Sequence, residues 1–297
     1  MTTSQWNAFE KFKDEFRAQC KKWAQYSGEL IPLQKSSSQK DTPDYPIETP
    51  VVYNTAMDEL SAESEIKLIV IGDNPGKNEQ LSINQKYLVG QAGKLGEGFF
   101  RNNPDLQIDF RKNVIILNKT PVHSAKTKHL IAIEKGLKSV NSPAQNLIEE
   151  SQRWMAKKTA ELHQALIKGA DKNSFIPELW LVGYTELKKN GIFIPYRDEL
   201  KKAYTNQSTS ADKPTTTSTN ATTDANATTT STNATTNDNA KASTNFLTTS
   251  WQKVFVYQHF SMNCFNKDIR NYHTANPENP LKQNLETLGH LHKQEIF

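Results

Sequence analysis

Three polar motifs follow apolar segments of the sequence, and their side chains are of the kinds that hold small polar ligands. The first runs from Gly72 to Gly76 (GDNPG), where the glycines and the proline set a tight turn that directs two polar side chains into a crevice. The second is Asn118 and the third is His259. An amide offers a donor and an acceptor, and carboxyl and imidazole groups exchange protons. Taken singly, the motifs also fit a phosphate-binding turn or plain connection, a turn former and a structural hydrogen-bonding histidine.

The elements that position these motifs are short apolar runs typical of buried parallel strands. They are Ile66 to Ile71, Val114 to Leu117, Leu179 to Val182 and Val254 to Tyr257. A long helix is predicted between the second and third runs, from Pro143 to Lys168. Strands that alternate with helices imply crossover connections, so we predict a three-layer α/β/α sandwich around a mainly parallel four-stranded sheet. Ligands bind beyond the carboxyl ends of such strands, where all three motifs lie.

The N-terminal segment predicts a helix with one face towards the core. Its apolar residues recur at spacings of three and four, and they are Trp6, Phe9, Phe12, Phe16, Cys20 and Trp23. Ser4 is the expected N-cap and Gly28 the expected stop. The stretch from Leu30 to Pro50 is rich in Pro, Ser and Asp, which favours a surface connection.

One segment is unsuited to a folded core. Residues 206–245 are almost entirely Thr, Asn, Ala, Ser and Asp, so they bury too little apolar surface to offset the entropy of ordering. We therefore predict a disordered insertion there, within a single α/β domain made of residues 1–205 and 246–297.

Composition narrows the class of protein. The formal net charge of +4 is too small to identify a nucleic-acid-binding protein by itself. The only two cysteines, Cys20 and Cys264, give neither a disulfide framework nor a metal-ligand spacing, so we predict a reducing compartment and no metal. No secretory signal opens the sequence and no apolar run has the length that a bilayer requires. We expect a cytoplasmic monomer that does not enter membranes.

Four segments of the sequence, taken together, resemble the motifs of a known protein family. They are Ile71 to Glu79 (IGDNPGKNE), Tyr87 to Leu95 (YLVGQAGKL), Val114 to Ser124 (VIILNKTPVHS) and Tyr257 to Ser261 (YQHFS). The first resembles the Gly-x-Asn-Pro-Gly motif of the mismatch-specific and single-strand-selective branches of the uracil-DNA glycosylase superfamily. The second is similar to the Pro-Phe-Val-Gly-x-Ala-Gly-x-Leu segment of the iron-sulphur branch. The third and fourth resemble the strand that carries the uracil-reading Asn and the His-Pro-Ser motif.

The sequence departs from that family pattern in three places. Two cysteines cannot supply the four ligands of an iron-sulphur cluster, so we expect no cofactor. Leu88 stands where the uracil-stacking Phe would be, which leaves stacking to Tyr87 or abolishes it. Phe260 replaces the proline of the His motif, so φ is no longer fixed by a ring there.

The resemblance implies a monofunctional DNA glycosylase for base excision repair. Such an enzyme flips uracil or a related deaminated base out of DNA and hydrolyses its N-glycosidic bond. Asn118 would read the uracil edge, and His259 would donate a hydrogen bond to the departing base. Asn74 would hold the attacking water, with Asp73 as a helper or base.

Further contacts follow from the same resemblance. The base would lie against Tyr87 or Leu88 and against the turn formed by Gly72, Pro75 and Gly76. Ser261 and the backbone near Gly76 and Gly93 would hold phosphates, and Met262 or Phe265 would enter the space left by the flipped base. Met262 and Phe265 equally fit the core of the following helix. Lys119 and His123 lie near the expected pocket mouth, or on a solvated loop.

Two alternative functions stay open. A binding module on the same fold would hold nucleic acid or a nucleotide without turnover. A flavodoxin-like nucleotide or phosphate protein would use the turn from Gly72 to Gly76 and would give no special role to Asn118 or His259.

Overall fold

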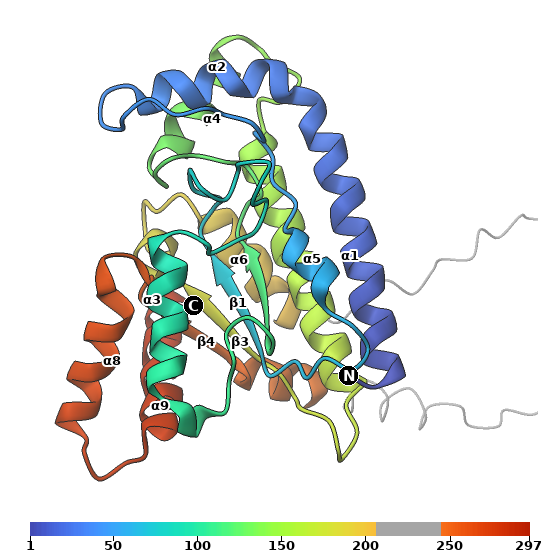
Figure 1. Ribbon diagram of the computed structural model, residues 1–297, viewed down its shortest axis with the longest axis vertical. Helices are drawn as coiled ribbons and strands as arrows, with labels where there is room; N and C mark the ends of the chain where they lie inside the picture. The colour runs from blue at the N-terminus through green and yellow to red at the C-terminus, as the bar shows by residue number, and fades with distance from the viewer. Residues whose placement is uncertain (206–244) are drawn as a thin grey trace, which may run out of the picture.

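A parallel sheet of four strands lies at the centre of the molecule, in the order β2-β1-β3-β4 (Figure 1). The computed structural model describes residues 1–205 and 245–297. The strands are β1 (Leu68–Gly72), β2 (Val114–Asn118), β3 (Glu178–Val182) and β4 (Val254–Tyr257). All four expected strands are therefore present.

The strands are apolar because helices cover both faces of the sheet. Every residue of β1, β2 and β4 is buried, and only the first residue of β3 is partly exposed. Gly72 is paired with Asn118, and Val182 with Tyr257. This register brings the carboxyl ends of neighbouring strands level, so the loops that follow them start at one edge.

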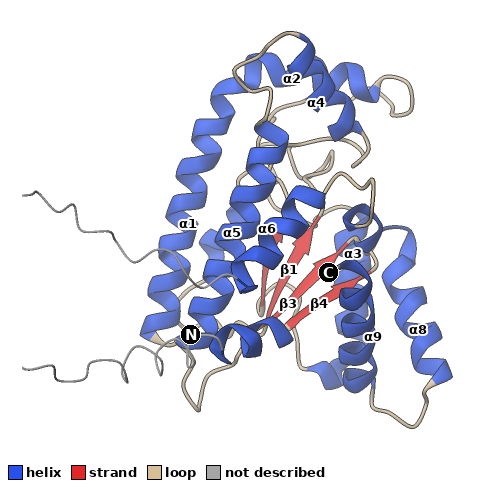
Figure 2. Ribbon diagram, turned by 180° about the vertical axis from the view of Figure 1, so that it is seen from behind, coloured by secondary structure: helices blue, strands red, loops and turns tan. Residues whose placement is uncertain are grey.

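Helices form a layer on each side of the sheet, and Figure 2 shows the same layers from behind. One layer contains α1 (Thr3–Trp23), α5 (Leu147–Lys168) and α6 (Ile194–Thr205). The other contains α3 (Gln91–Asn102), α8 (Cys264–Ala275) and α9 (Leu281–Ile296). Two further helices, α2 (Ser27–Ser38) and α4 (His129–Ser139), pack together beyond the carboxyl ends of the strands. The predicted three-layer α/β/α sandwich is confirmed.

Short 3-10 helices connect these elements. They are η1 (Ala24–Tyr26), η2 (Thr55–Glu59), η3 (Pro104–Leu106), η4 (Tyr184–Leu187) and η5 (Ser261–Asn263).

Three predictions for the N-terminal part of the chain differ from the structure. The N-cap of α1 is Thr2, whose side chain forms a capping box with Gln5, and not Ser4. Gly28 does not stop a helix, because it lies inside α2. The segment from Leu30 to Pro50, predicted as a surface connection, is helical up to Ser38, where α2 ends, and residues 39–50 form the connection. Its Leu30 is fully buried, and such tertiary packing outweighs the low helix propensity of its Pro and Ser residues.

The remaining boundaries are close to those expected. Helix α5 begins at Leu147 instead of Pro143 and ends at Lys168 as predicted. The predicted insertion at 206–245 lies outside the described residues except for Asn245, the first described residue of a helical stretch that includes 245–252. Among the helices of residues 1–205 and 245–297, none is both long enough and apolar enough to cross a bilayer.

Candidate active site at the carboxyl edge of the sheet

A buried ion pair joins the loops that follow β1 and β2. Lys119 Nζ lies 2.5 Å from Asp73 Oδ1, and the lysine side chain is fully buried. The same ammonium group donates to the carbonyl oxygens of Gly72, at 3.3 Å, and Val182, at 2.5 Å. Its three protons therefore have three acceptors, and Lys119 ties together the ends of β1, β2 and β3. Burial lowers the pKa of Lys119, and the nearby carboxylate opposes that shift. The solvated-loop interpretation of Lys119 is wrong.

Gly183, directly after β3, makes room for this ion pair. Its φ of +89° lies in the left-handed region. A Cβ at this position would lie 2.3 Å from Asp73 Oδ1 and 3.2 Å from Lys119 Nζ. Only a glycine allows the ion pair and the β3 turn to occupy the same place.

Asn118 ends β2 with an unused hydrogen-bond donor. The residue is 1% exposed, and among the described residues its Nδ2 has no hydrogen-bond partner. Gly72 lies opposite on β1, where a Cβ would stand 2.5 Å from Asn118 Oδ1, so the absence of a side chain there makes space for the amide. A buried donor without an acceptor costs about 1–3 kcal/mol. A ligand that offers an acceptor would recover this energy.

The loop after β1 holds Asn74 in one orientation. Its Nδ2 donates to the carbonyl oxygens of Pro75 and Ser124, both at 3.1 Å, and to the Ser124 hydroxyl at 3.0 Å. Because carbonyl oxygens only accept, the nitrogen must face them. The half-buried amide therefore keeps Oδ1 as its remaining acceptor, to which none of the described groups donates.

His259 carries its neutral-state proton on Nε2. The backbone N–H of Ser261 donates to His259 Nδ1 at 3.1 Å, and the Ser261 hydroxyl lies 2.7 Å from the same atom. Since a backbone N–H only donates, Nδ1 is unprotonated. Burial lowers the pKa of the ring, the charge of Asp73 opposes this, and the charge of Lys119 adds to it. His259 is thus within electrostatic reach of the buried ion pair and presents an Nε2–H for which no described residue is an acceptor.

The loop beyond His259 keeps the backbone that a proline would impose. Phe260 has a φ of −64°, within the range to which a proline ring restricts this angle. Its ring is buried between Phe110 and Phe265. Phe265 is itself 1% exposed, so its assignment as a wedge into DNA is wrong. Met262 is 81% exposed with a φ of 53°, so it is not a core residue, and its wedge role stays a prediction.

A carboxylate already occupies the turn from Gly72 to Gly76. Gly76 N–H donates to Glu79 Oε2 at 3.0 Å. Glu79 is buried, and this burial raises its pKa to about 7 although backbone hydrogen bonds oppose the shift. A phosphate-binding turn needs such N–H groups free. The geometry therefore argues against the flavodoxin-like phosphate alternative, and equally against a phosphate contact of the Gly76 N–H in a glycosylase.

His123 is a structural residue. It is fully buried, with Nδ1 2.8 Å from the Pro75 carbonyl oxygen and Nε2 3.0 Å from the Tyr45 hydroxyl. Burial lowers its pKa to about 4. His123 supports the loop after β1 through its contact with Pro75. It therefore lies neither at a pocket mouth nor on a solvated loop.

The segment from Tyr87 to Gly93 packs tightly against the start of α3. Tyr87 is 1% exposed, and its hydroxyl donates to the Val52 carbonyl at 2.5 Å. Leu88 is buried with a φ of 52°. A Cβ at Gly93 would stand 1.4 Å from the Leu88 carbonyl oxygen, so this close approach requires glycine. The contacts of these residues with a base or a phosphate stay predictions.

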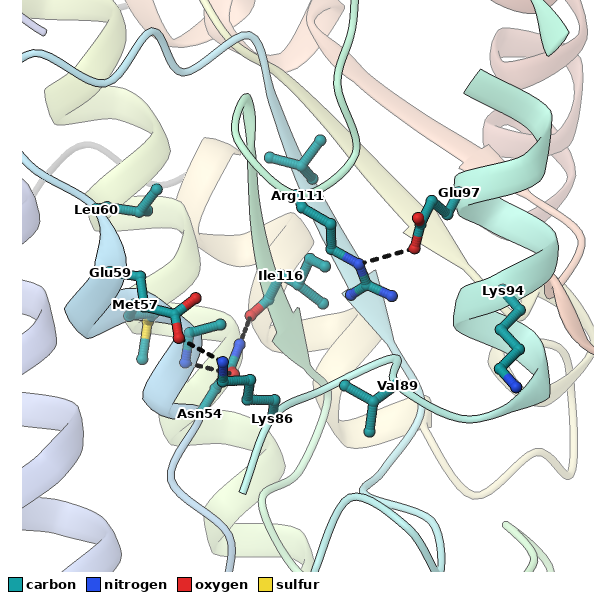
Figure 3. Close-up of a pocket in the computed structure, with 12 residues that line it drawn as sticks. Asn54, Met57, Glu59, Leu60, Lys86, Val89, Lys94, Glu97, Arg111 and Ile116 are labelled. Carbon is teal, nitrogen blue, oxygen red and sulfur yellow. Dashed lines mark hydrogen bonds and ion pairs between the residues drawn. The ribbon is translucent and has the colours of Figure 1, made fainter. Parts of the chain in front are cut away.

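A cavity of about 420 Å³ lies beside the edge strand β2, towards the amino end of that strand (Figure 3). Val114 and Ile116 contribute to its lining, as do Arg111 and Glu97, which form an ion pair of 3.1 Å. None of Asn74, Asn118 and His259 lines this cavity. It is therefore separate from these three polar groups at the carboxyl edge.

Metal ligands are not grouped in the described part of the chain. Within residues 1–205 and 245–297, no three His, Cys, Asp or Glu side chains are placed to hold an ion. Cys20 and Cys264 are both free thiols. The chemistry that this edge offers is thus hydrogen bonding by an amide and an imidazole beside a buried ion pair.

Comparison with known proteins adds no assignment. Neither the protein-family models, nor the curated proteins, nor the solved structures with which the chain was compared match it. The features that point to a function are therefore the side-chain geometry at the carboxyl edge and the motifs of the sequence.

Several residues of this edge were not assigned a role from the sequence. Lys119 neutralises Asp73, Ser124 orients Asn74, and Glu79 closes the turn at Gly76. The one signal for Lys119 is its position directly after an apolar strand. Nothing local marks Ser124 or Glu79, because their partners are set by the folded loops.

Proposed function

We propose that this protein is a DNA glycosylase that removes uracil, or a related deaminated base, without a cofactor. The observation that carries the proposal is the buried, unused Nδ2 of Asn118 at the sheet edge that also presents the Nε2–H of His259. The motif resemblance supports the same reaction. A base in a duplex is out of reach, so the target nucleotide must be flipped out at a cost of a few kcal/mol.

Asn118 is the group that reads the base. Its amide offers a donor to uracil O4 and an acceptor to uracil N3–H, a pattern that the amino group of cytosine opposes. Gly72, opposite on β1, leaves room for its Oδ1, because a Cβ there would stand only 2.5 Å from this oxygen. Discrimination therefore depends on the donor and the acceptor that this buried amide presents.

His259 is the group that stabilises the departing base. Cleavage builds negative charge on the base and positive charge on the sugar, as in other glycosidic bond cleavages. The Nε2–H of a neutral imidazole donates to base O2 as that charge grows, and burial strengthens the contact. The Ser261 N–H fixes the required tautomer, and the lowered pKa of His259 keeps the ring neutral.

Asn74 is the group that holds water on the other side of the sugar. Its Nδ2 is anchored to Pro75 and Ser124, which leaves Oδ1 to accept a hydrogen bond from the water. An amide is a poor base, so the reaction relies mainly on leaving-group stabilisation. Asp73 acts as a helper whose charge is balanced by Lys119.

One experiment tests the proposal. Purified protein is incubated with single- and double-stranded oligonucleotides that contain one uracil, and abasic sites are then cleaved with alkali. We expect cleavage at the uracil, and Asn118→Asp should relax the preference for uracil over cytosine because its carboxylate no longer donates as an amide does. Asn146→Asp, at the exposed N-cap of α5, is the matched control and should keep the preference. Absence of alkali-labile sites in both substrates would overturn the proposal.

A nucleic-acid-binding protein without turnover is the second candidate. The observation that favours it is the engagement of both Asp73 oxygens, Oδ1 by Lys119 and Oδ2 by Thr127 at 3.3 Å. Both Asp73 oxygens thus already accept a hydrogen bond, and an oxygen engaged in this way is a weaker base towards a water molecule. Binding of uracil-containing DNA without cleavage would identify this candidate.

A further inference from the structure

The segment from Ser124 to His129 borders the candidate site on one side. The Ser124 hydroxyl and carbonyl accept hydrogen bonds from Asn74, and Thr127 Oγ1 donates to Asp73 Oδ2 at 3.3 Å. Whatever occupies the carboxyl edge therefore lies next to this segment.

Two lysines flank Thr127 and extend towards solvent. The side chains of Lys126 and Lys128 are 46% and 65% exposed, and their Nζ atoms lie 3.3 and 2.5 Å from Asp41 Oδ2. The hydrogen bond from Lys128, with a smaller contribution from Lys126, holds the pKa of Asp41 well below its usual range. One carboxylate thus faces two ammonium groups, and the cluster keeps a net positive charge.

We propose that Lys126 and Lys128 form a phosphate-binding surface that grips the backbone of a nucleic acid strand at the carboxyl edge. This inference rests on the proposed function, because it takes DNA as the partner. Ammonium groups bind phosphates as point charges, and each phosphate that they neutralise releases counterions. Asp41 holds both lysines together when no strand is bound and competes with the phosphates when one approaches.

A salt titration tests the surface independently of catalysis. The probe is a fluorescein-labelled single-stranded oligonucleotide without uracil, and its affinity is measured by anisotropy from about 50 to 200 mM NaCl. We expect Lys126→Gln with Lys128→Gln to weaken binding about tenfold at the lower salt concentrations. The slope of log K against log salt should fall by about 1.4, or 0.7 for each lost contact.

The matched control is Lys168→Gln with Lys172→Gln. Lys168 ends α5 and Lys172 precedes the amino end of β3, so both lie at the opposite edge of the sheet. Both are exposed, and neither has an ion-pair partner among the described residues. This variant loses the same charge and should bind like the unchanged protein. Asp41→Asn should bind more tightly, because it removes the competing carboxylate.

The outcomes separate this inference from the proposed function. Equal affinities and equal slopes of log K against log salt for the two double variants would contradict the proposed phosphate-binding surface. Absence of salt-dependent binding by the unchanged protein would contradict it as well. Lysine-dependent binding without uracil excision would contradict the proposed glycosylase activity and support the phosphate-binding surface. Excision with the same KM for uracil-containing DNA in the two double variants would support the glycosylase activity and contradict the phosphate-binding surface. Melting curves of both double variants confirm that each is folded.

Discussion

His123 and His259 lie in the loops after β2 and β4, and burial lowers the pKa of both. Both ring nitrogens of His123 lie within hydrogen-bonding distance of protein oxygens, the Pro75 carbonyl and the Tyr45 hydroxyl. His259 uses only Nδ1, and its Nε2 has no partner in the part of the chain that the structure describes. Burial alone therefore does not distinguish these two histidines, whereas the unused Nε2–H of His259 does.

Two asparagines differ in the same way. Both are 1% exposed. Asn54 donates to the Ile116 carbonyl at 2.8 Å and accepts from the N–H groups of Ala56 and Tyr87, both at 3.2 Å. Asn118 has an amide nitrogen with no acceptor among the described residues. The Asn54 amide is thus fully hydrogen-bonded within the fold, whereas Asn118 keeps a donor that a ligand can use.

The largest expected effect concerns the histidine pair. His259→Ala should lower the rate of uracil excision about 10²–10³-fold, because one donor to the developing anion is lost. Its melting temperature should fall only slightly, because the ring loses the contacts of Nδ1 with the N–H and hydroxyl of Ser261, whereas Nε2–H supports no contact among the described residues. His123→Ala should chiefly lower the melting temperature, because Pro75 and Tyr45 lose their partner. Initial rates and thermal melts of both variants check this, and equal rate losses would break the comparison.

The asparagine pair should show a smaller effect, on stability. Asn54→Leu should lower the free energy of unfolding by about 3 kcal/mol, because one buried carbonyl and two N–H groups lose their partners. Asn118→Leu should leave that free energy unchanged or raise it, because it removes a donor that had no acceptor. Urea unfolding of both variants measures the difference. Similar losses would show that Asn118 has a structural partner after all.

The smallest expected effect is a pH dependence of stability. The pKa of His123 is about 4 when folded, below the value of about 6.5 in an unfolded chain. The folded state thus takes up the proton only at lower pH, and stability falls as the pH drops from about 6.5 towards 4. His123 should account for about 2 kcal/mol of the loss between pH 7 and 5. His123→Gln should remove that share and leave the share of His163, whose folded pKa is also about 4.

Much of the architecture could be predicted from local patterns. A parallel strand covered on both faces must be apolar throughout, so β1, β2, β3 and β4 stand out as short apolar runs. Helix α2 could not be predicted in this way. Its Pro32 and its serines favour a loop, whereas fully buried Leu30 and the hydrogen bonds of Gln34 to distant carbonyls keep it helical.

The sequence by itself determined the sheet and placed Asn74, Asn118 and His259 at the ends of strands, because these follow from periodicity and chain order. Only the tertiary structure decided which hydrogen-bond donors are used. The ion pair of Asp73 with Lys119 joins residues 46 positions apart, and the free Nε2–H of His259 depends on how Ser261 folds back onto the ring. Completion of hydrogen bonding depends on neighbours in space, and these neighbours exist only after the strands have come together.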